Sequence, residues 1–125
     1  MSAPSTNRQL REATDADLQL LLQQNRFVLV KFVDEDCKVC VELAPRMTAI
    51  ANDPQYAHVL FLRIDSGENP VSAQTVSFHQ APFIVAYQDG QLRHCETVFT
   101  EKRVRDILDT FLMPEPEPER ADAAR

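Results

Sequence analysis

The sequence predicts an α/β domain in which a mixed central sheet carries helices on both faces. Two short, almost continuously apolar runs, residues 26–33 and 58–65, have the composition of strands that are covered on both sides. A helical pattern separates these runs, so we expect them to pair in parallel. Residues 81–99 then have the pattern of a β-hairpin around Asp89-Gly90, and its antiparallel strands must join the same sheet.

The first half of the chain contains two predicted helices. Thr14, followed by Asp17 three residues later, predicts a capped start for a helix over residues 15–25. Between the two apolar runs, hydrophobic residues recur about once per helical turn over residues 36–53. Pro45 lies inside this second pattern, and we therefore expect that helix to be kinked.

The second half contains two more predicted helices. Asn69 and Pro70 suit the cap and the first position of a short helix over residues 71–78. Thr100 suits the cap of a last helix over residues 101–112, which has apolar residues at helical spacing. The expected order is therefore helix, strand, helix, strand, helix, hairpin and helix.

Composition narrows the class of protein. With 125 residues, 44% of them hydrophobic, the chain suits one globular domain. A net charge of −6 without a basic cluster argues against a nucleic-acid partner. We expect a cytoplasmic protein with no membrane partner, because the N-terminus lacks the pattern of a secretion signal and no apolar run reaches membrane-spanning length. Residues 1–13 look like a flexible polar arm, and residues 113–125 a disordered Glu/Pro-rich tail.

Cys37 and Cys40 stand two residues apart at the predicted turn between the first strand and the kinked helix. The start of a helix offers unpaired N–H groups and a partial positive charge, which stabilise a thiolate. Cys40 lies one turn further along and within reach of a disulfide. An exposed, acidified thiol next to a semi-buried one is the arrangement that thiol–disulfide exchange needs.

Two other readings of the cysteine pair stay open at this point. The two residues can be small buried side chains with no chemistry, or they can be half of a zinc site. Zinc requires two more ligands, and the candidates are His58, His79, His94 and Cys95. His94 and Cys95 are neighbours on a predicted strand and point to opposite faces, which makes them a poor second pair.

These features together resemble the thioredoxin family over residues 14–112, which we take as the folded domain. The resemblance rests on Cys37 and Cys40 at a strand-to-helix turn, Pro45 five residues later, Ala81-Pro82 before the hairpin strand and Asp89-Gly90 at its turn. It implies the thioredoxin fold, with a cis peptide bond before Pro82, and with Pro82 facing the cysteine pair. It also implies that an extended substrate segment pairs with the main chain around Ala81.

The resemblance also implies an activity. Cys37 would attack a substrate disulfide as the nucleophile, and Cys40 would resolve the mixed disulfide. The chemistry needs no metal and no cofactor apart from the redox-active Cys37–Cys40 disulfide. The implied partners are a disulfide-containing protein substrate and an external reductant such as a thioredoxin reductase. We therefore expect a thiol–disulfide oxidoreductase that reduces protein disulfides; the alternative is a thioredoxin-like interaction module whose dithiol is redox-competent but is not turned over.

The residues around the cysteines depart from the family pattern. Asp36 stands where these proteins usually have Trp, and Lys38-Val39 replace Gly-Pro inside the pair. We expect Asp36, Lys38 and Val39 to contact substrate together with Ala81 and Pro82.

Lys31 is the second departure, because it occupies the position of the family's buried acid, six residues before the first cysteine. The lysine that many members carry on the next strand falls near Phe61. We expect Lys31 to be partly desolvated near Cys40 and either to shift the cysteines toward thiolate or to shuttle a proton itself. The alternatives are that its amine reaches water or pairs with Asp34 or Glu35.

Overall fold

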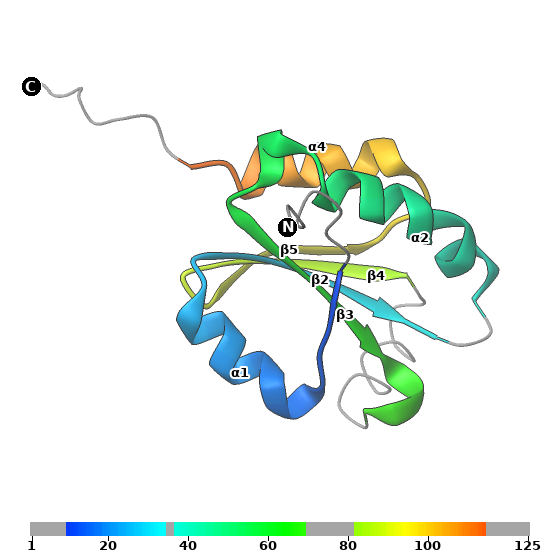
Figure 1. Cartoon of the computed structure of the whole chain (residues 1–125), viewed down its shortest axis with the longest axis horizontal. Coiled ribbons are helices and arrows are strands. Elements are labelled where there is room, and N and C mark those ends of the chain that lie inside the picture. Colours follow the sequence, from blue (N-terminus) through cyan, green and yellow to red (C-terminus); the bar gives the residue numbers. More distant parts are fainter. Residues whose placement is uncertain (1–9, 35–36, 70–81, 115–125) are drawn as a thin grey trace, which may run out of the picture.

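A five-stranded mixed sheet forms the centre of the molecule, in the order β1-β3-β2-β4-β5. The computed structural model describes residues 10–34, 37–69 and 82–114. Helix α1 covers one face of the sheet, and α2 and α4 cover the other (Figure 1). Strand β2 pairs in parallel with β3 and antiparallel with β4. The predicted fold class, a mixed sheet with helices on both faces, is confirmed.

From α1 on, the described helices and strands follow the predicted order, and a short strand, β1, precedes them. The elements are β1 (Arg11–Glu12), α1 (Asp15–Gln24), β2 (Phe27–Val33), α2 (Lys38–Ala51), β3 (Val59–Asp65), β4 (Phe83–Gln88), β5 (Gln91–Thr97) and α4 (Glu101–Phe111), with single 3-10 turns at Pro54–Tyr56 and Ser66–Glu68. The described helices are too short and too polar to span a bilayer.

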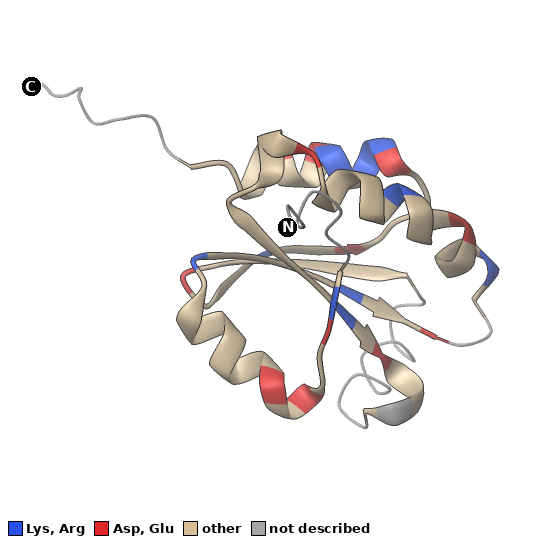
Figure 2. Ribbon diagram, viewed as in Figure 1, with Lys and Arg blue, Asp and Glu red and all other residues tan. Residues whose placement is uncertain are grey.

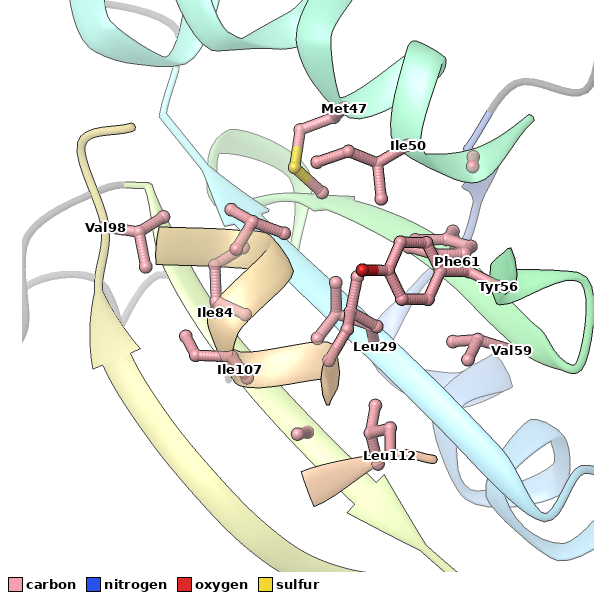
Figure 3. Packing of buried hydrophobic residues seen from close by; sticks show 14 of the residues in the cluster. Leu29, Met47, Ile50, Tyr56, Val59, Phe61, Ile84, Val98, Ile107 and Leu112 are labelled. Atoms are coloured by element: carbon pink, nitrogen blue, oxygen red, sulfur yellow. The ribbon is translucent and has the colours of Figure 1, made fainter. Parts of the chain in front are cut away.

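Strand β2 organises the core because all seven of its residues are buried. Successive side chains point to opposite faces of the sheet. Leu29 therefore packs with Met47 and Ile84 under α2 and α4 (Figure 3). Val28 and Val30 pack in a second cluster on the face that carries α1. The apolar composition of this strand is thus explained by burial on both sides.

Local signals in the sequence fix several element ends. The Thr14 side chain accepts a hydrogen bond from the Asp17 N–H at 3.1 Å, and the Asp17 carboxylate accepts one from the Thr14 N–H at 3.2 Å. Asp89 and Gly90 both have positive φ, 55° and 79°, as the tight β4–β5 turn requires. Helix α2 continues through Pro45.

The predicted flexible arm over residues 1–13 is wrong at its end. Arg11–Glu12 forms the short strand β1, which pairs in parallel with β3 at Leu62 and Arg63. The Arg63 guanidinium also donates to the Glu12 carboxylate at 2.7 Å. Two polar residues carry no hydrophobic pattern, so their pairing with the edge of β3 is invisible in the sequence.

Some predictions fall on residues whose structure is not described. The helix predicted over residues 71–78 lies outside the described residues. The same is true of residues 1–9 and of the tail from residue 115. These parts of the domain prediction stay predictions.

The cap of α4 gives a test of the local structure. The Thr100 hydroxyl accepts a hydrogen bond from the Arg103 N–H at 3.2 Å. We expect Thr100→Ala to lower the free energy of unfolding by about 1 kcal/mol, because the N–H loses its partner. Thr110, exposed in the last turn of the same helix, is the matched control. Urea denaturation would contradict the assignment if the two Thr→Ala variants lost the same stability.

Candidate active site

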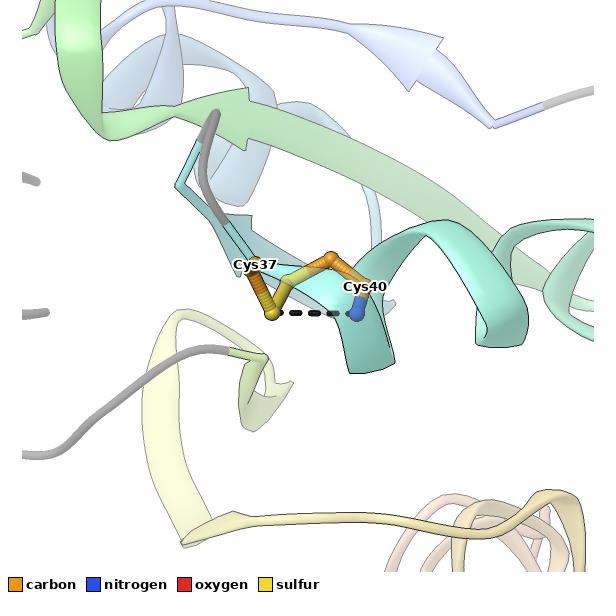
Figure 4. The surroundings of a disulfide bond; sticks show 2 residues. All are labelled: Cys37 and Cys40. Carbon is orange, nitrogen blue, oxygen red and sulfur yellow. Dashed lines mark hydrogen bonds between the residues drawn. A yellow bond between two sulfur atoms is a disulfide. The ribbon is translucent and has the colours of Figure 1, made fainter.

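Cys37 and Cys40 form a disulfide at the point where the chain leaves β2 and enters α2. Their Cα atoms are 5.2 Å apart, which is within the usual range for a disulfide. Cys37 is the N-cap residue of α2, and Cys40 lies in its first turn. The two side chains converge at the open end of the helix (Figure 4).

The backbone N–H of Cys40 donates a hydrogen bond to Sγ of Cys37 at 3.0 Å (Figure 4). This N–H is one of those that a helix leaves without an internal partner at its first turn. A negative sulfur at this position would gain a charge-assisted hydrogen bond and the favourable end of the helix dipole. The geometry therefore favours the thiolate form of Cys37 once the disulfide is reduced.

The two sulfurs differ in their access to solvent. Cys37 is half-buried, whereas Cys40 is buried, with 6% of its surface exposed. The side chain of Lys38 is exposed, and that of Val39 is half-buried. An incoming group can therefore reach the surface formed by Cys37 and Lys38 more easily than Cys40.

Pro82 lies at the same end of the strands as the dithiol. Phe83 pairs with Phe32, so the residue before it is level with Val33 at the end of β2. Pro82 is buried, and its carbonyl accepts a hydrogen bond from the Val98 N–H at 3.1 Å. Asp36 and Ala81, and with Ala81 the peptide bond before Pro82, lie outside the described residues.

A groove beside the dithiol was not anticipated from the sequence. It has a volume of about 550 Å³ and lies between the first turns of α2 and the start of α4. Val39 and Leu43 line one side, and Phe99, with 62% of its surface exposed, lies on the other. A single aromatic residue just before the Thr100 cap is the only sequence signal for this surface.

The described residues do not support the zinc reading. Within residues 10–34, 37–69 and 82–114, no three His, Cys, Asp or Glu side chains form a cluster that could hold a metal. His94 is hydrogen-bonded to the Glu96 carboxylate at 2.7 Å, and its ring stacks on that of Phe111. His58 is hydrogen-bonded to the Leu112 carbonyl. His79 is not among the described residues.

Comparisons with known proteins agree with this geometry. The sequence profile of the thioredoxin family matches residues 9–112. The chain belongs to the thioredoxin family. A thioredoxin of Buchnera aphidicola subsp. Baizongia pistaciae (strain Bp) is 28% identical over 96 residues, which are 75% of this chain and 86% of that protein.

Solved thioredoxin structures share the fold. The X-ray structure of Fasciola hepatica thioredoxin is 27% identical, with a TM-score of 0.73 over 82% of this chain and 99% of that one. Oxidised mitochondrial thioredoxin 3 of Saccharomyces cerevisiae is 21% identical, with a TM-score of 0.74 over 86% and 100% of the two chains. Membership of this family and the close cysteine pair support thiol–disulfide oxidoreductase chemistry in general, and thioredoxins perform it through their dithiol without a cofactor.

Lys31 is the residue of β2 that departs from the family pattern. It lies in the middle strand β2 and is 2% exposed. Burial, followed by the positive charge of Arg63, lowers the pKa of the Lys31 amine to about 8. At neutral pH the buried side chain is therefore still mostly charged. Phe61 lies in the apolar core, as its position beside Leu29 requires.

The surroundings of Lys31 bear on the two alternatives, in which its amine reaches water or pairs with a neighbouring acid. No ion pair joins its amine to the described residues, so the alternative of a pair with Asp34 is not seen there. Glu35 lies outside those residues. The side chain is too deeply buried to reach open solvent freely. A role as modulator of the cysteines stays a prediction.

The buried charge of Lys31 gives a prediction about stability. The unfolded chain binds this proton up to about pH 10.5, whereas the folded protein releases it at about pH 8. The buried charge therefore lowers the free energy of unfolding by its full amount below pH 8. This loss of stability disappears as the pH rises toward 10.5. We expect Lys31→Met to raise the free energy of unfolding of the oxidised protein at pH 7 by about 1 to 3 kcal/mol.

Chemical denaturation at pH 7 and at pH 10 would measure this gain, which should shrink at the higher pH. Lys102→Met is the control, because Lys102 is an exposed lysine of α4. A gain that is absent at pH 7, or equal at the two pH values, would contradict the pKa of Lys31.

Proposed function

We propose that this member of the thioredoxin family reduces disulfide bonds of protein substrates in the cytoplasm through Cys37 and Cys40. The observation that carries the proposal is the hydrogen bond from the Cys40 N–H to Sγ of Cys37 at the start of α2. It supports Cys37 as the attacking thiolate, because the same donor would hold a negative sulfur. The deeper burial of Cys40 supports its role as the second, resolving thiol.

The proposed reaction has two exchange steps. The Cys37 thiolate attacks one sulfur of the substrate disulfide, forms a mixed disulfide and expels the other substrate sulfur as a thiolate. Cys40 then loses its proton and attacks Sγ of Cys37, which releases the second substrate thiolate. Two electrons pass to the substrate, and the product is the Cys37–Cys40 disulfide of the present structure.

A complete catalytic cycle needs an external source of electrons. Thioredoxins in general are reduced by a thioredoxin reductase. We propose the same class of reductant for this chain, because its dithiol must be regenerated after each turnover. Among the solved structures of similar fold, one is titled for the thiol-resolving mechanism of a yeast mitochondrial 1-Cys peroxiredoxin through glutathione and thioredoxin systems.

Substrate would bind across the surface around Cys37. Lys38, Val39 and Pro82 border this surface, and we propose that Asp36 and Ala81 contribute to it. The groove next to Val39 adds an apolar wall at Phe99. An extended substrate segment with a disulfide could contact all of these residues if it ran across the ends of β2 and β4.

Insulin reduction tests the activity. We expect the Cys95→Ser protein, supplied with dithiothreitol, to reduce insulin disulfides, because Cys95 is an exposed free thiol outside the pair. Adding Cys37→Ser or Cys40→Ser should remove turnover, because each variant lacks one of the two exchange steps. An activity no greater than that of the variant lacking both cysteines would favour the interaction module.

The two cysteines should differ when turnover is blocked. In the Cys95→Ser background, Cys40→Ser should accumulate a mixed disulfide with insulin, because Cys37 attacks and nothing resolves the product. Cys37→Ser should not. Non-reducing electrophoresis with and without dithiothreitol would measure the adduct. Adducts formed through Cys40 and not through Cys37 would reverse the assigned roles.

A further inference from the structure

Lys31 is a buried titratable group that the two exchange steps do not use. Its side chain is almost completely enclosed, and no described acid lies within ion-pair distance of it. A buried ammonium without a counter-charge is unfavourable by several kcal/mol in proteins. Such a group is stabilised whenever a negative charge appears next to it.

The topology places Lys31 on the face of the sheet that α2 covers. Lys31 pairs with Ile84 in β4, and opposed residues of an antiparallel pair share one face of the sheet. Ile84 belongs to the cluster under α2, so Lys31 also points to that face. Because α2 follows β2 directly and runs back over the sheet, its first inward-facing residue, Cys40, lies over the end of β2. Lys31 is therefore beneath the first turn of α2.

We propose that Lys31 is a redox-linked proton site: reducing the Cys37–Cys40 disulfide increases the affinity of the Lys31 amine for a proton, so that the reduced protein holds an ammonium–thiolate pair. The inference rests on the part of the proposed function that makes the dithiol reducible, and not on the reduction of protein substrates. Lys31 acts here as a positioning residue for charge, because it forms no bond to sulfur or substrate.

The proton balance of the reduction depends on pH. Two electrons from a thiol reductant such as glutathione, with one proton, convert the disulfide into a Cys37 thiolate and a Cys40 thiol. Below pH 8 Lys31 is already protonated in the oxidised protein, so no further proton is needed. Above pH 8 the oxidised protein has lost that proton, and reduction takes up a second proton at the Lys31 amine.

Other charged groups lie on the strands around Lys31, and those in the first turns of α2, Lys38 and Glu42, are exposed. On β3, Arg63 opposes Lys31 and lowers its pKa, while the Glu12 carboxylate of β1 binds Arg63. Asp65, at the end of β3, accepts a hydrogen bond from the Gly67 N–H. Asp34 is exposed at the end of β2. In the proposed coupling, the charge that changes with the redox state is that of the sulfurs.

The coupling must act in both directions. If the thiolate increases the proton affinity of Lys31 by some factor, the ammonium stabilises the reduced protein by the same factor. At neutral pH the wild-type protein should therefore be reduced more readily than Lys31→Met, and should be the weaker reductant. The advantage should fall above pH 8, and it should disappear once Lys31 is neutral in both redox states.

NMR of the wild-type protein tests the first half of the proposal. The chain has three lysines, so 13Cε labelling gives three signals, and the Lys31→Met spectrum identifies that of Lys31. We expect the Lys31 signal to titrate near pH 8 in the oxidised protein. In the reduced protein its midpoint should rise by about 0.7 or more, which corresponds to a fivefold coupling. Equal midpoints in the two states would overturn the proposal.

Glutathione equilibria test the second half, with Cys95→Ser as background. The comparison uses the parent, Lys31→Met and Lys102→Met from pH 6.5 to 9.5, so that the pH dependence of glutathione cancels. We expect the parent to be reduced about fivefold or more favourably than Lys31→Met near pH 7. This ratio should fall toward one above pH 8, and Lys102→Met should follow the parent throughout.

The outcomes separate this inference from the proposed function. A ratio of one at neutral pH, or a ratio that does not change above pH 8, would overturn the role of Lys31. Neither measurement involves the disulfide of a second, substrate protein. A protein that fails to reduce insulin but shows the pH-dependent ratio would contradict the proposed function and leave the coupling of Lys31 intact.

Discussion

The junction between β2 and α2 is the constraint on which the site depends. Strand β2 is held between β3 and β4 and buried on both faces, so the place where its chain leaves the sheet is fixed. Helix α2 begins there and packs back over the same strand, which holds its first turn above the sheet. Cys37 caps that turn. Its sulfur accepts a hydrogen bond from the Cys40 N–H, because an N–H in the first turn of a helix has no backbone carbonyl of the helix to bond to. The thiol chemistry of this protein is therefore a consequence of how one strand is packed.

The charges around this junction distinguish the chain from the family pattern that its sequence resembles. A buried acid would oppose a thiolate above it, whereas the buried amine of Lys31 favours one. The amine is destabilised in the oxidised protein by burial and by Arg63. In the proposed coupling, reduction supplies the negative charge that would balance the Lys31 ammonium. The proposal thus links three properties through the Lys31 side chain: the stability of the folded protein, the reduction of the Cys37–Cys40 disulfide and the binding of a proton by the amine.

The sequence predicted the parts of this structure that depend on local signals. The caps at Thr14 and Thr100 and the turn at Asp89-Gly90 follow from side-chain and backbone preferences of a few residues. Strand β1 was missed because its pairing depends on an unfilled edge of β3 and not on its own two residues. The groove at Phe99 was missed for a related reason, since it forms only when α2 and α4 lie together. Figure 2 shows basic and acidic residues side by side along α4. Some of them form ion pairs with residues far away in the sequence, such as Arg105 with Asp53 at 2.8 Å. These pairs also depend on the fold and could not be predicted from local signals.

The rate of alkylation of Cys37 as a function of pH tests the central claim most directly. The measurement uses the reduced Cys95→Ser, Cys40→Ser protein, in which Cys37 is the one remaining thiol. If the start of α2 holds this sulfur as a thiolate, the iodoacetamide rate should reach half its plateau below about pH 7.5, against about 8.5 for an ordinary thiol. A midpoint at or above the ordinary value would show that the helix start does not activate Cys37, and would contradict the account.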